Sequence, residues 1–173
     1  MTESGISPRA VPLAKRAIVR TNSDEHDEYG FVTEDQRLTK AMNEKRFRKV
    51  CLLQRELETV ETTKLYGPPK ADVTILSWGS TKGPVREAMR LLNEKGVIVN
   101  FVQIVYLQPF PEARVKKVMD EAKKTVVIEN NVTSQLSGVI REKLLRDVEH
   151  KILKYDGRPF KPGEIFKRVL EVM

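Results

Sequence analysis

Five consecutive residues, Gly79, Ser80, Thr81, Lys82 and Gly83, have the types and spacing of a possible anion contact. They lie between an apolar run typical of a strand and a periodicity typical of a helix, and free amides and the helix dipole favour anions at a helix start. Lys82 would add a positive charge. A phosphate loop, however, needs four residues between its first glycine and a Gly-Lys-Ser/Thr end, and a dinucleotide-binding turn needs Gly-x-Gly-x-x-Gly. The loop matches neither pattern, so we favour a tight structural connection and keep the five residues as a candidate anion contact.

Other titratable side chains do not assemble into a catalytic or metal-binding set. The acidic run Asp24–Glu28 mixes carboxylates with one imidazole, but consecutive residues rarely converge on one metal, and no second ligand pair follows at metal spacing. We expect a solvated or partner-facing loop there. His150 is expected to be a surface or edge histidine, and Cys51 a thiol packed between apolar helix positions. We therefore predict no catalytic residue and no metal site in this chain.

Glu129, Asn130 and Asn131 end a predicted strand, and the carboxyl ends of strands form the ligand-facing edge of an open α/β sheet. Two asparagines before a helix are also ordinary turn and capping residues. Both interpretations stay open.

The second half of the chain alternates between strand and helix patterns. Short apolar runs bounded by turn residues predict strands, and apolar residues at steps of three and four predict helices. Such alternation indicates crossover connections and a mostly parallel sheet, and therefore an α/β fold. The predicted strands are 73–78, 97–107, 125–129 and 152–155, and the predicted helices are 84–95, 109–122, 133–146 and a last one that begins at 162.

A proline-rich break divides the chain. The sequence Gly67-Pro68-Pro69 separates a polar N-terminal part from the alternating pattern that follows. We therefore expect an N-terminal arm with a long helix at 1–70 and an α/β domain at 71–173.

The arm is predicted to be irregular up to position 32, apart from a possible short strand at Ala17–Val19. The long helix is predicted at 33–62, because Thr33 and Gln36 have the spacing of a capping box. A single helix cannot bury its own apolar stripe, so this one must lie on the downstream domain or on another chain. The stripe consists of Phe47, Val50, Leu53, Leu57 and Val60.

The charge pattern and the cysteine count exclude several classes of protein. Thirty-one basic residues are interspersed with 24 acidic ones, for a net charge of +7, and no concentrated basic block indicates nucleic-acid binding. A lone cysteine excludes an internal disulfide and fits a reducing compartment. No apolar run approaches membrane-spanning length. We expect a cytoplasmic protein that binds neither nucleic acid nor membrane.

Five segments that occur in one order resemble a known family. The resemblance is to the C-terminal part of the alpha subunit of 2-oxoacid:ferredoxin oxidoreductases, of the 2-oxoglutarate/pyruvate type and most closely the 2-oxoglutarate branch, and it covers nearly the whole chain. It implies a transketolase C-terminal-like domain, a three-layer α/β sandwich whose mostly parallel sheet has one antiparallel edge strand. The segments are SPRAVP (Ser7–Pro12), NSDEHDEYG (Asn22–Gly30), KRFRK (Lys45–Lys49), SWGSTKGP (Ser77–Pro84) and ILKYDGRPF (Ile152–Phe160).

The resemblance implies oxidative decarboxylation of a 2-oxoacid to an acyl-coenzyme A, with electrons passed to ferredoxin. It implies a complex that uses thiamine diphosphate, Mg, an iron–sulfur cluster and coenzyme A. In this family the thiamine site lies between the pyrimidine-binding domain of the alpha subunit and the beta subunit, and this sequence contains neither. It also has no Gly-Asp-Gly diphosphate motif and no cysteine set for a cluster. We therefore expect no cofactor on this chain and no activity of the chain alone. The implied partners are the pyrimidine-binding domain and the beta subunit, with ferredoxin an indirect one.

Under this hypothesis the arm and the long helix dock the domain to the catalytic domains and hold their relative positions. The arm is polar and interrupted by prolines, with little apolar content to fold by itself. The expected interface residues are Arg9, Asp24, Asp27 and Glu28 on the arm and Phe47, Val50, Leu53 and Leu57 on the helix.

Two residues depart from the family pattern. Leu13 stands where glycine is expected after the SPRAVP proline, and Ser134 stands where glycine is expected before Gln135, so we expect no particular backbone geometry at either position. An independent anion- or nucleotide-binding module that uses the Gly79–Gly83 loop is the alternative function. Whether the chain is the product of a split gene or an excised domain stays open.

Overall fold

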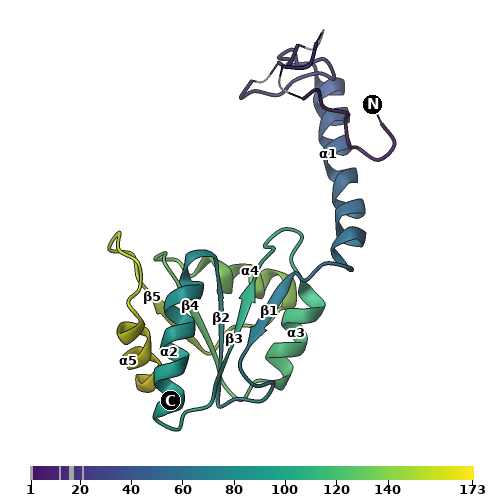
Figure 1. Cartoon of the computed structure of the whole chain (residues 1–173). Coiled ribbons are helices and arrows are strands. Elements are labelled where there is room, and N and C mark those ends of the chain that lie inside the picture. Colours follow the sequence, from purple (N-terminus) through teal and green to yellow (C-terminus); the bar gives the residue numbers. More distant parts are fainter. Residues whose placement is uncertain (1, 12, 16–17, 21) are drawn as a thin grey trace. The chain divides into compact units, whose positions relative to one another are not determined.

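The chain folds as two compact units in the computed structural model, which describes all residues except 1, 12, 16–17 and 21 (Figure 1). The described part of Met1–Val60 consists of one long helix and loops, and Glu61–Met173 holds a sheet with helices. Of the short strand expected at Ala17–Val19, Ala17 lies outside the described residues, and the two that follow it form no strand. Pro12 of the SPRAVP segment also lies outside them.

The Glu61–Met173 unit is built on a five-stranded sheet with the strand order β1-β3-β2-β4-β5. Four strands run parallel, and β1 pairs antiparallel with β3 at one edge. This arrangement confirms the predicted α/β fold with one antiparallel edge strand (Figure 1). The strands are β1 (Thr63–Tyr66), β2 (Val73–Trp78), β3 (Val99–Ile104), β4 (Thr125–Glu129) and β5 (His150–Leu153).

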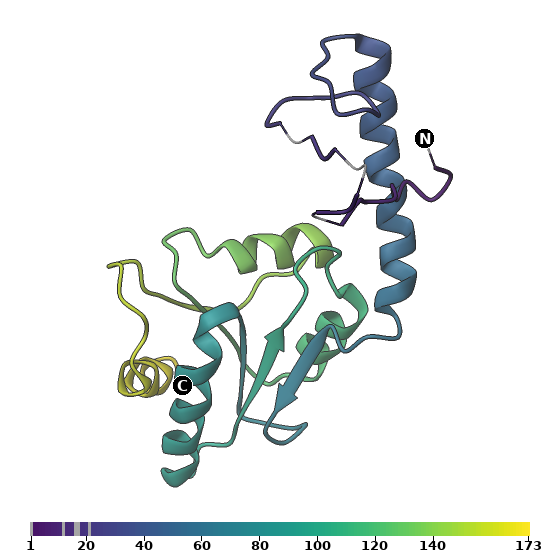
Figure 2. The ribbon, with the colours of Figure 1, turned by 45° about the horizontal axis from the view of Figure 1, so that its top comes forward.

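Helices cover both faces of the sheet and complete the three layers (Figure 2). Helices α2 and α5 pack on one face, where Val85 and Ile165 are fully buried, and α3 and α4 pack on the other, where Val115 and Ile140 are fully buried. The central strands are therefore buried on both sides, which explains their near-continuous apolar sequences. The helices are α2 (Lys82–Glu94), α3 (Glu112–Glu121), α4 (Gln135–Leu144) and α5 (Pro162–Glu171), and a 3-10 turn, η1 (Gly79–Thr81), precedes α2.

The unit begins ten residues earlier than the boundary expected at 70/71, because β1 belongs to its sheet. The proline-rich break is thus a connection inside the unit. Gly67 turns the chain there with φ +90°, and a Cβ at this position would lie 2.8 Å from the carbonyl oxygen of Val99. The buried Asn100 amide donates to the Pro68 carbonyl at 3.0 Å, which fastens the turn to β3.

The long helix α1 spans Gln36–Leu57, which is shorter at both ends than the predicted 33–62. Its N-cap is Asp35, whose Oδ1 accepts hydrogen bonds from the Arg37 and Leu38 amides at 3.0 and 2.9 Å. The capping box predicted from Thr33 is therefore wrong. Asp35 is the stronger cap because its carboxylate also faces the positive end of the helix dipole.

Candidate functional site

A pocket of about 190 Å³ lies where β2 and β4 end. These two strands are parallel neighbours in the sheet, and the helices that follow them, α2 and α4, cover opposite faces. The carboxyl ends of two such strands form the crevice in which open α/β sheets bind ligands. The pocket is lined by Trp78, Gly79, Ser80, Thr81, Glu129, Asn130, Asn131 and Gln135.

Glu129, the last residue of β4, places a buried carboxylate beside this pocket. The Leu136 amide, in the first turn of α4, donates to both carboxylate oxygens at 2.9 and 3.0 Å. The Asn131 amide donates at 2.7 Å, and the Ser134 hydroxyl and the Trp78 indole N–H each donate at 3.3 Å. Glu129 therefore does the work of an N-cap for α4, where Ser134 makes no capping bond of its own. Its oxygens are engaged in holding the start of the helix.

Asn131 caps the same helix, because its Oδ1 accepts a hydrogen bond from the Gln135 amide at 3.1 Å. Asn130 donates to the Arg158 carbonyl at 3.5 Å. Of the two interpretations of Glu129–Asn131, turn and capping chemistry accounts for the contacts observed. The same residues also stand at the ligand-facing edge, so both interpretations describe part of what is found.

The candidate anion loop is divided by the structure. Gly79, Ser80 and Thr81 line the pocket, whereas Lys82 and Gly83 do not. The Lys82 ammonium lies 5.6 Å from the centroid of the Tyr66 ring instead. The charged side chain that does line the pocket is the carboxylate of Glu129, which would repel an anion. The anion contact stays a prediction. Three of its five residues line the pocket, and the Lys82 ammonium lies near the Tyr66 ring instead.

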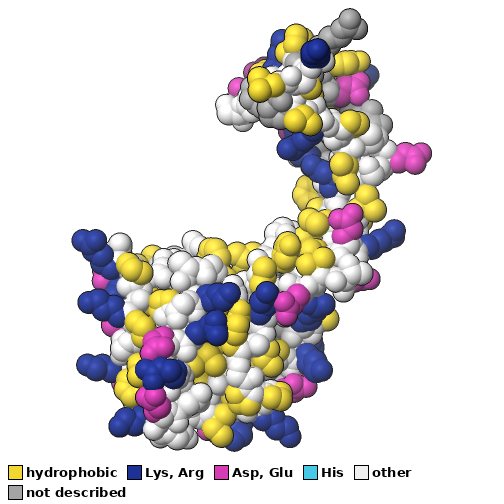
Figure 3. All heavy atoms as spheres, in the orientation of Figure 1, with side chains coloured by type: hydrophobic (Ala, Val, Ile, Leu, Met, Phe, Trp, Pro, Cys, Tyr) yellow, Lys and Arg dark blue, Asp and Glu magenta, His cyan; other side chains and the backbone are white. Residues whose placement is uncertain are grey.

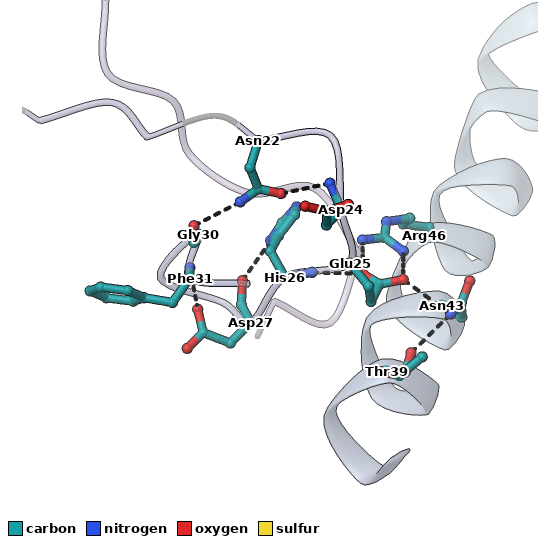
Figure 4. Close-up of polar contacts among 10 residues, drawn as sticks. All are labelled: Asn22, Asp24, Glu25, His26, Asp27, Gly30, Phe31, Thr39, Asn43 and Arg46. Atoms are coloured by element: carbon teal, nitrogen blue, oxygen red, sulfur yellow. Dashed lines mark hydrogen bonds and ion pairs between the residues drawn. The ribbon is translucent and has the colours of Figure 1, made fainter. Parts of the chain in front are cut away.

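In the Met1–Val60 unit, the acidic run forms a hairpin loop that is fastened to α1 (Figure 4). The Arg46 guanidinium donates to both oxygens of Glu25, with a distance of 2.9 Å between Nη1 and Oε2, and the Asn43 amide donates to Oε2 at 3.4 Å. The Arg46 hydrogen bond and the His26 amide lower the pKa of Glu25 from 4.5 to about 2. We did not predict this role for Glu25, which is the residue that anchors the run on the helix.

Asp27 closes the hairpin from within. Its Oδ1 accepts hydrogen bonds from the Tyr29 and Phe31 amides at 2.9 Å each, and its own amide donates to the Phe31 carbonyl at 2.8 Å. An antiparallel bridge between His26 and Val32 joins the two sides. The run is therefore ordered by its own turn chemistry. Among the described residues, no three His, Cys, Asp or Glu side chains lie together so that they could hold a metal ion.

The expected interface residues are mostly open to solvent, and their role stays a prediction. The prediction that Cys51 is a packed thiol is wrong, because its side chain is exposed. His150 is the first residue of the edge strand β5, as expected of an edge histidine. The exposed members of the interface set are Arg9, Asp24, Glu28, Phe47 and Leu53, and the half-buried ones are Asp27, Val50 and Leu57. None of the helices in the described part of the chain is long and apolar enough to cross a membrane.

Comparison with known proteins gives the family. Residues 71–165 match the family model of the pyruvate:ferredoxin oxidoreductase core domain II. The chain is 36% identical over 174 residues to the alpha subunit of 2-oxoacid:ferredoxin oxidoreductase 2 from Aeropyrum pernix, an alignment that covers 99% of this chain and 27% of the relative. The chain thus spans about a quarter of the length of such relatives.

Solved structures agree with the sequence match. The 2-oxoglutarate:ferredoxin oxidoreductase from Magnetococcus marinus, solved with 2-oxoglutarate, coenzyme A and succinyl-CoA bound, superposes with a TM-score of 0.70 at 34% identity, over 98% of this chain and 29% of that one. A split-gene transketolase superposes with a TM-score of 0.52 at 16% identity, over 63% of this chain and 40% of that one, which shows a shared fold only. The fold, the family model and the sequence identity to relatives over the whole chain agree. The chain belongs to the 2-oxoacid:ferredoxin oxidoreductase family, as a portion of the alpha subunit.

Proposed function

We propose that this chain is a non-catalytic part of a thiamine-diphosphate-dependent 2-oxoacid:ferredoxin oxidoreductase, in which it serves assembly and holds the catalytic domains in position. The observation that carries this proposal is the apolar surface of the Met1–Val60 unit. Among the described residues of that unit, Met42 is the buried apolar side chain, at 2% exposure. A folded segment with so little core of its own needs an external surface to bury its apolar groups. Its exposed apolar side chains are Ile6, Val11, Leu13, Ile18, Val19, Tyr29, Phe31, Val32, Leu38, Phe47, Leu53 and Val60.

Contacts within the chain order the hairpin in the absence of a partner. The Glu25–Arg46 pair holds it on α1, and the Arg20 guanidinium lies 3.9 Å from the centroid of the Phe31 ring. A pre-organised surface loses less conformational entropy on association than a segment that folds on binding. This supports docking through a formed element, with Phe31 and Phe47 as aromatic anchors.

The partners in this proposal are the pyrimidine-binding domain and the beta subunit, with ferredoxin acting indirectly, in the cytoplasm. The substrate is a 2-oxoacid, and 2-oxoglutarate is favoured because the Magnetococcus marinus relative was solved with that acid bound. The product is then an acyl-coenzyme A, with the electrons passed to ferredoxin.

The residues described here do not fit the cofactors of such a complex. A diphosphate–Mg site needs free oxygen ligands, and the carboxylate that lines the pocket, Glu129, already accepts bonds from four residues. An iron–sulfur cluster needs a set of thiolates, and the chain has one cysteine. The proposal therefore places thiamine diphosphate, Mg and the clusters on the other parts of the complex.

Recovery of the beta subunit with the tagged chain from its source cells tests the proposal. We expect the double variant Phe31→Ser, Phe47→Ser to bind the beta subunit about thirtyfold more weakly and to recover correspondingly less of it, because two aromatic anchors together contribute on the order of 2 kcal/mol to association. The matched control is Tyr155→Ser in the other unit, whose exposure of 68% is close to the 72% of Phe47. Equal recovery with the double variant and the control would contradict the docking role.

An independent anion- or nucleotide-binding module is the second candidate, and the position of Gly79–Thr81 in the pocket favours it. Nucleotides or coenzyme A at a hundredfold excess over the dissociation constant would then stabilise the chain by about 2.7 kcal/mol, and Lys82→Glu would abolish the gain. The position of Glu129 in the same pocket speaks against it.

A further inference from the structure

We propose that Lys82 and Arg86, held together over Tyr66, form a docking site for an acidic segment of a protein partner. The inference rests on α2 and β1 alone, so it stands or falls separately from the assembly role proposed for the arm and α1. The Arg86 guanidinium lies 4.9 Å and the Lys82 ammonium 5.6 Å from the centroid of the Tyr66 ring. One aromatic ring thus gathers two cations that are one helical turn apart.

Neither cation has a carboxylate partner among the described residues of the chain. Arg90, the next cation along α2, is different. It pairs with Glu87, at 2.7 Å between Nη2 and Oε1, and with Glu94. Figure 3 shows the same contrast: basic side chains gather between the upper part of α2 and β1, and acidic side chains flank the basic one farther down α2. The two cations over Tyr66 therefore keep their charge available to another molecule.

The placement of these cations opposes the stability of α2. Lys82 is its first residue, where the helix dipole is positive, and the first turn contains no acidic residue. Lys82 and Arg86 are also like charges at positions i and i+4, which repel. Contact with the Tyr66 ring offsets part of these costs. In the free chain, this placement of Lys82 and Arg86 contributes little to stability. It is explained if an anionic partner supplies the counter-charges that the two cations lack.

The chemistry favours acidic side chains of a protein over a nucleotide. The Tyr66 ring is already in contact with both cations and stacks on Phe101 at 5.5 Å between centroids, so it is not free to stack a nucleobase. Neither cation lines the pocket at the ends of β2 and β4, and small ligands bind in concave sites. Two carboxylates about 6 Å apart, as on one face of a partner helix, match two cations spaced by one turn.

Titration of the full chain with poly-L-glutamate, followed by NMR, tests the site. We expect the variant Lys82→Gln, Arg86→Gln to bind about tenfold more weakly, because it loses two exposed ion pairs that each strengthen binding by at most about fivefold. The matched control is Arg90→Gln, Lys95→Gln, which removes the same charge from α2 and its C-cap and should change affinity less than about twofold. Raising the salt from about 20 to about 200 mM should weaken the wild-type complex, since surface charges are screened.

Three results would overturn the inference. The first is equal weakening in the control variant, which would show a response to net charge alone. The second is inorganic phosphate binding at these residues as tightly as poly-L-glutamate, which would identify a small-anion site. The third is a loss of thermal stability in Lys82→Gln, Arg86→Gln by several degrees, which would show that the cations serve to hold Tyr66. Unchanged or increased stability together with lost binding supports the docking site.

Discussion

Replacement of Glu129 by glutamine tests whether a single buried carboxylate fixes the site at the ends of β2 and β4. The side chain is 1% exposed and accepts hydrogen bonds from both neighbouring elements, through Trp78 on β2 and Leu136 on α4. Glutamine keeps the shape of glutamate but replaces one acceptor oxygen by an NH₂ donor. The substitution therefore changes the hydrogen bonding at this point and little else.

The size of the effect follows from the contacts of the two oxygens. If the remaining oxygen keeps the bonds from Leu136 and Ser134, the new NH₂ faces the Asn131 amide at 2.7 Å and the Trp78 indole N–H at 3.3 Å. Two donors then lose their acceptor, and a hydrogen bond to a charged group contributes about 1.5–3 kcal/mol. We expect the free energy of unfolding of the Glu61–Met173 unit to fall by about 3 kcal/mol and its Tm to fall by about 10 °C.

Urea unfolding of the full chain, followed by circular dichroism, measures this change. The matched control is Glu171→Gln at an exposed position of α5, which should change the free energy of unfolding by less than about 0.5 kcal/mol. A value for Glu129→Gln as small as that of the control would refute the reasoning. It would show that α4 begins where it does without the carboxylate.

Three further substitutions and titrations check other parts of the structure. Gly67→Ala should destabilise the chain by about 2 kcal/mol or more in urea unfolding, because φ is +90° and the added Cβ would lie 2.8 Å from the Val99 carbonyl oxygen. Leu145→Gly should stabilise it by about 1 kcal/mol, since leucine there has φ +53° and is 89% exposed; a lower Tm would show that the side chain is packed. The pKa of Glu25 lies below its ordinary value, so its contact with Arg46 stabilises the hairpin above about pH 4.5 and is lost as the pH falls through about 2. Carbon NMR of the carboxyl group should give a midpoint near 2 that moves toward 4.5 in Arg46→Gln, and an unmoved midpoint would contradict the anchoring role.

The central part of the fold could be predicted from the sequence, because burial on both faces leaves a continuous apolar run. Strands β2, β3 and β4 and the four helices of the unit follow from such runs and from helical periodicity. Strand β1 could not be predicted in the same way. Its four residues, TKLY, contain one charged and one exposed apolar side chain, and they become a strand because they pair with β3. Because β1 pairs with β3, the unit begins after residue 60 and not after residue 70 as expected. Local sequence does not encode this pairing.

The site was predictable in pieces and not as a whole. Gly79–Thr81 and Glu129–Asn131 were each recognisable as residues that follow a strand. The two segments line one pocket because β2 and β4 are neighbours in the sheet. The order of strands in a sheet cannot be predicted from local sequence patterns. The anchoring of Glu25 by Arg46 joins positions 21 residues apart and was missed for the same reason. The direction of Lys82 toward Tyr66 was missed because β1 was missed.

The two residues that depart from the family pattern, Leu13 and Ser134, share a backbone conformation but differ in their hydrogen bonds. Leu13 and Ser134 both adopt left-handed backbone, with φ +67° and +54°, at the positions where glycine was expected. At Ser134 the contacts explain this conformation, because its hydroxyl donates to Glu129 at 3.3 Å and accepts from the Ser137 hydroxyl at 2.6 Å. Leu13 is fully exposed and makes no such bond, so the conformation is strained without a compensating contact inside the described chain. Both positions therefore keep the left-handed backbone conformation that glycine favours. At Ser134 this conformation is held by the hydrogen bond to Glu129, the carboxylate that caps α4. At Leu13 the apolar side chain belongs to the exposed surface that we propose meets the partner.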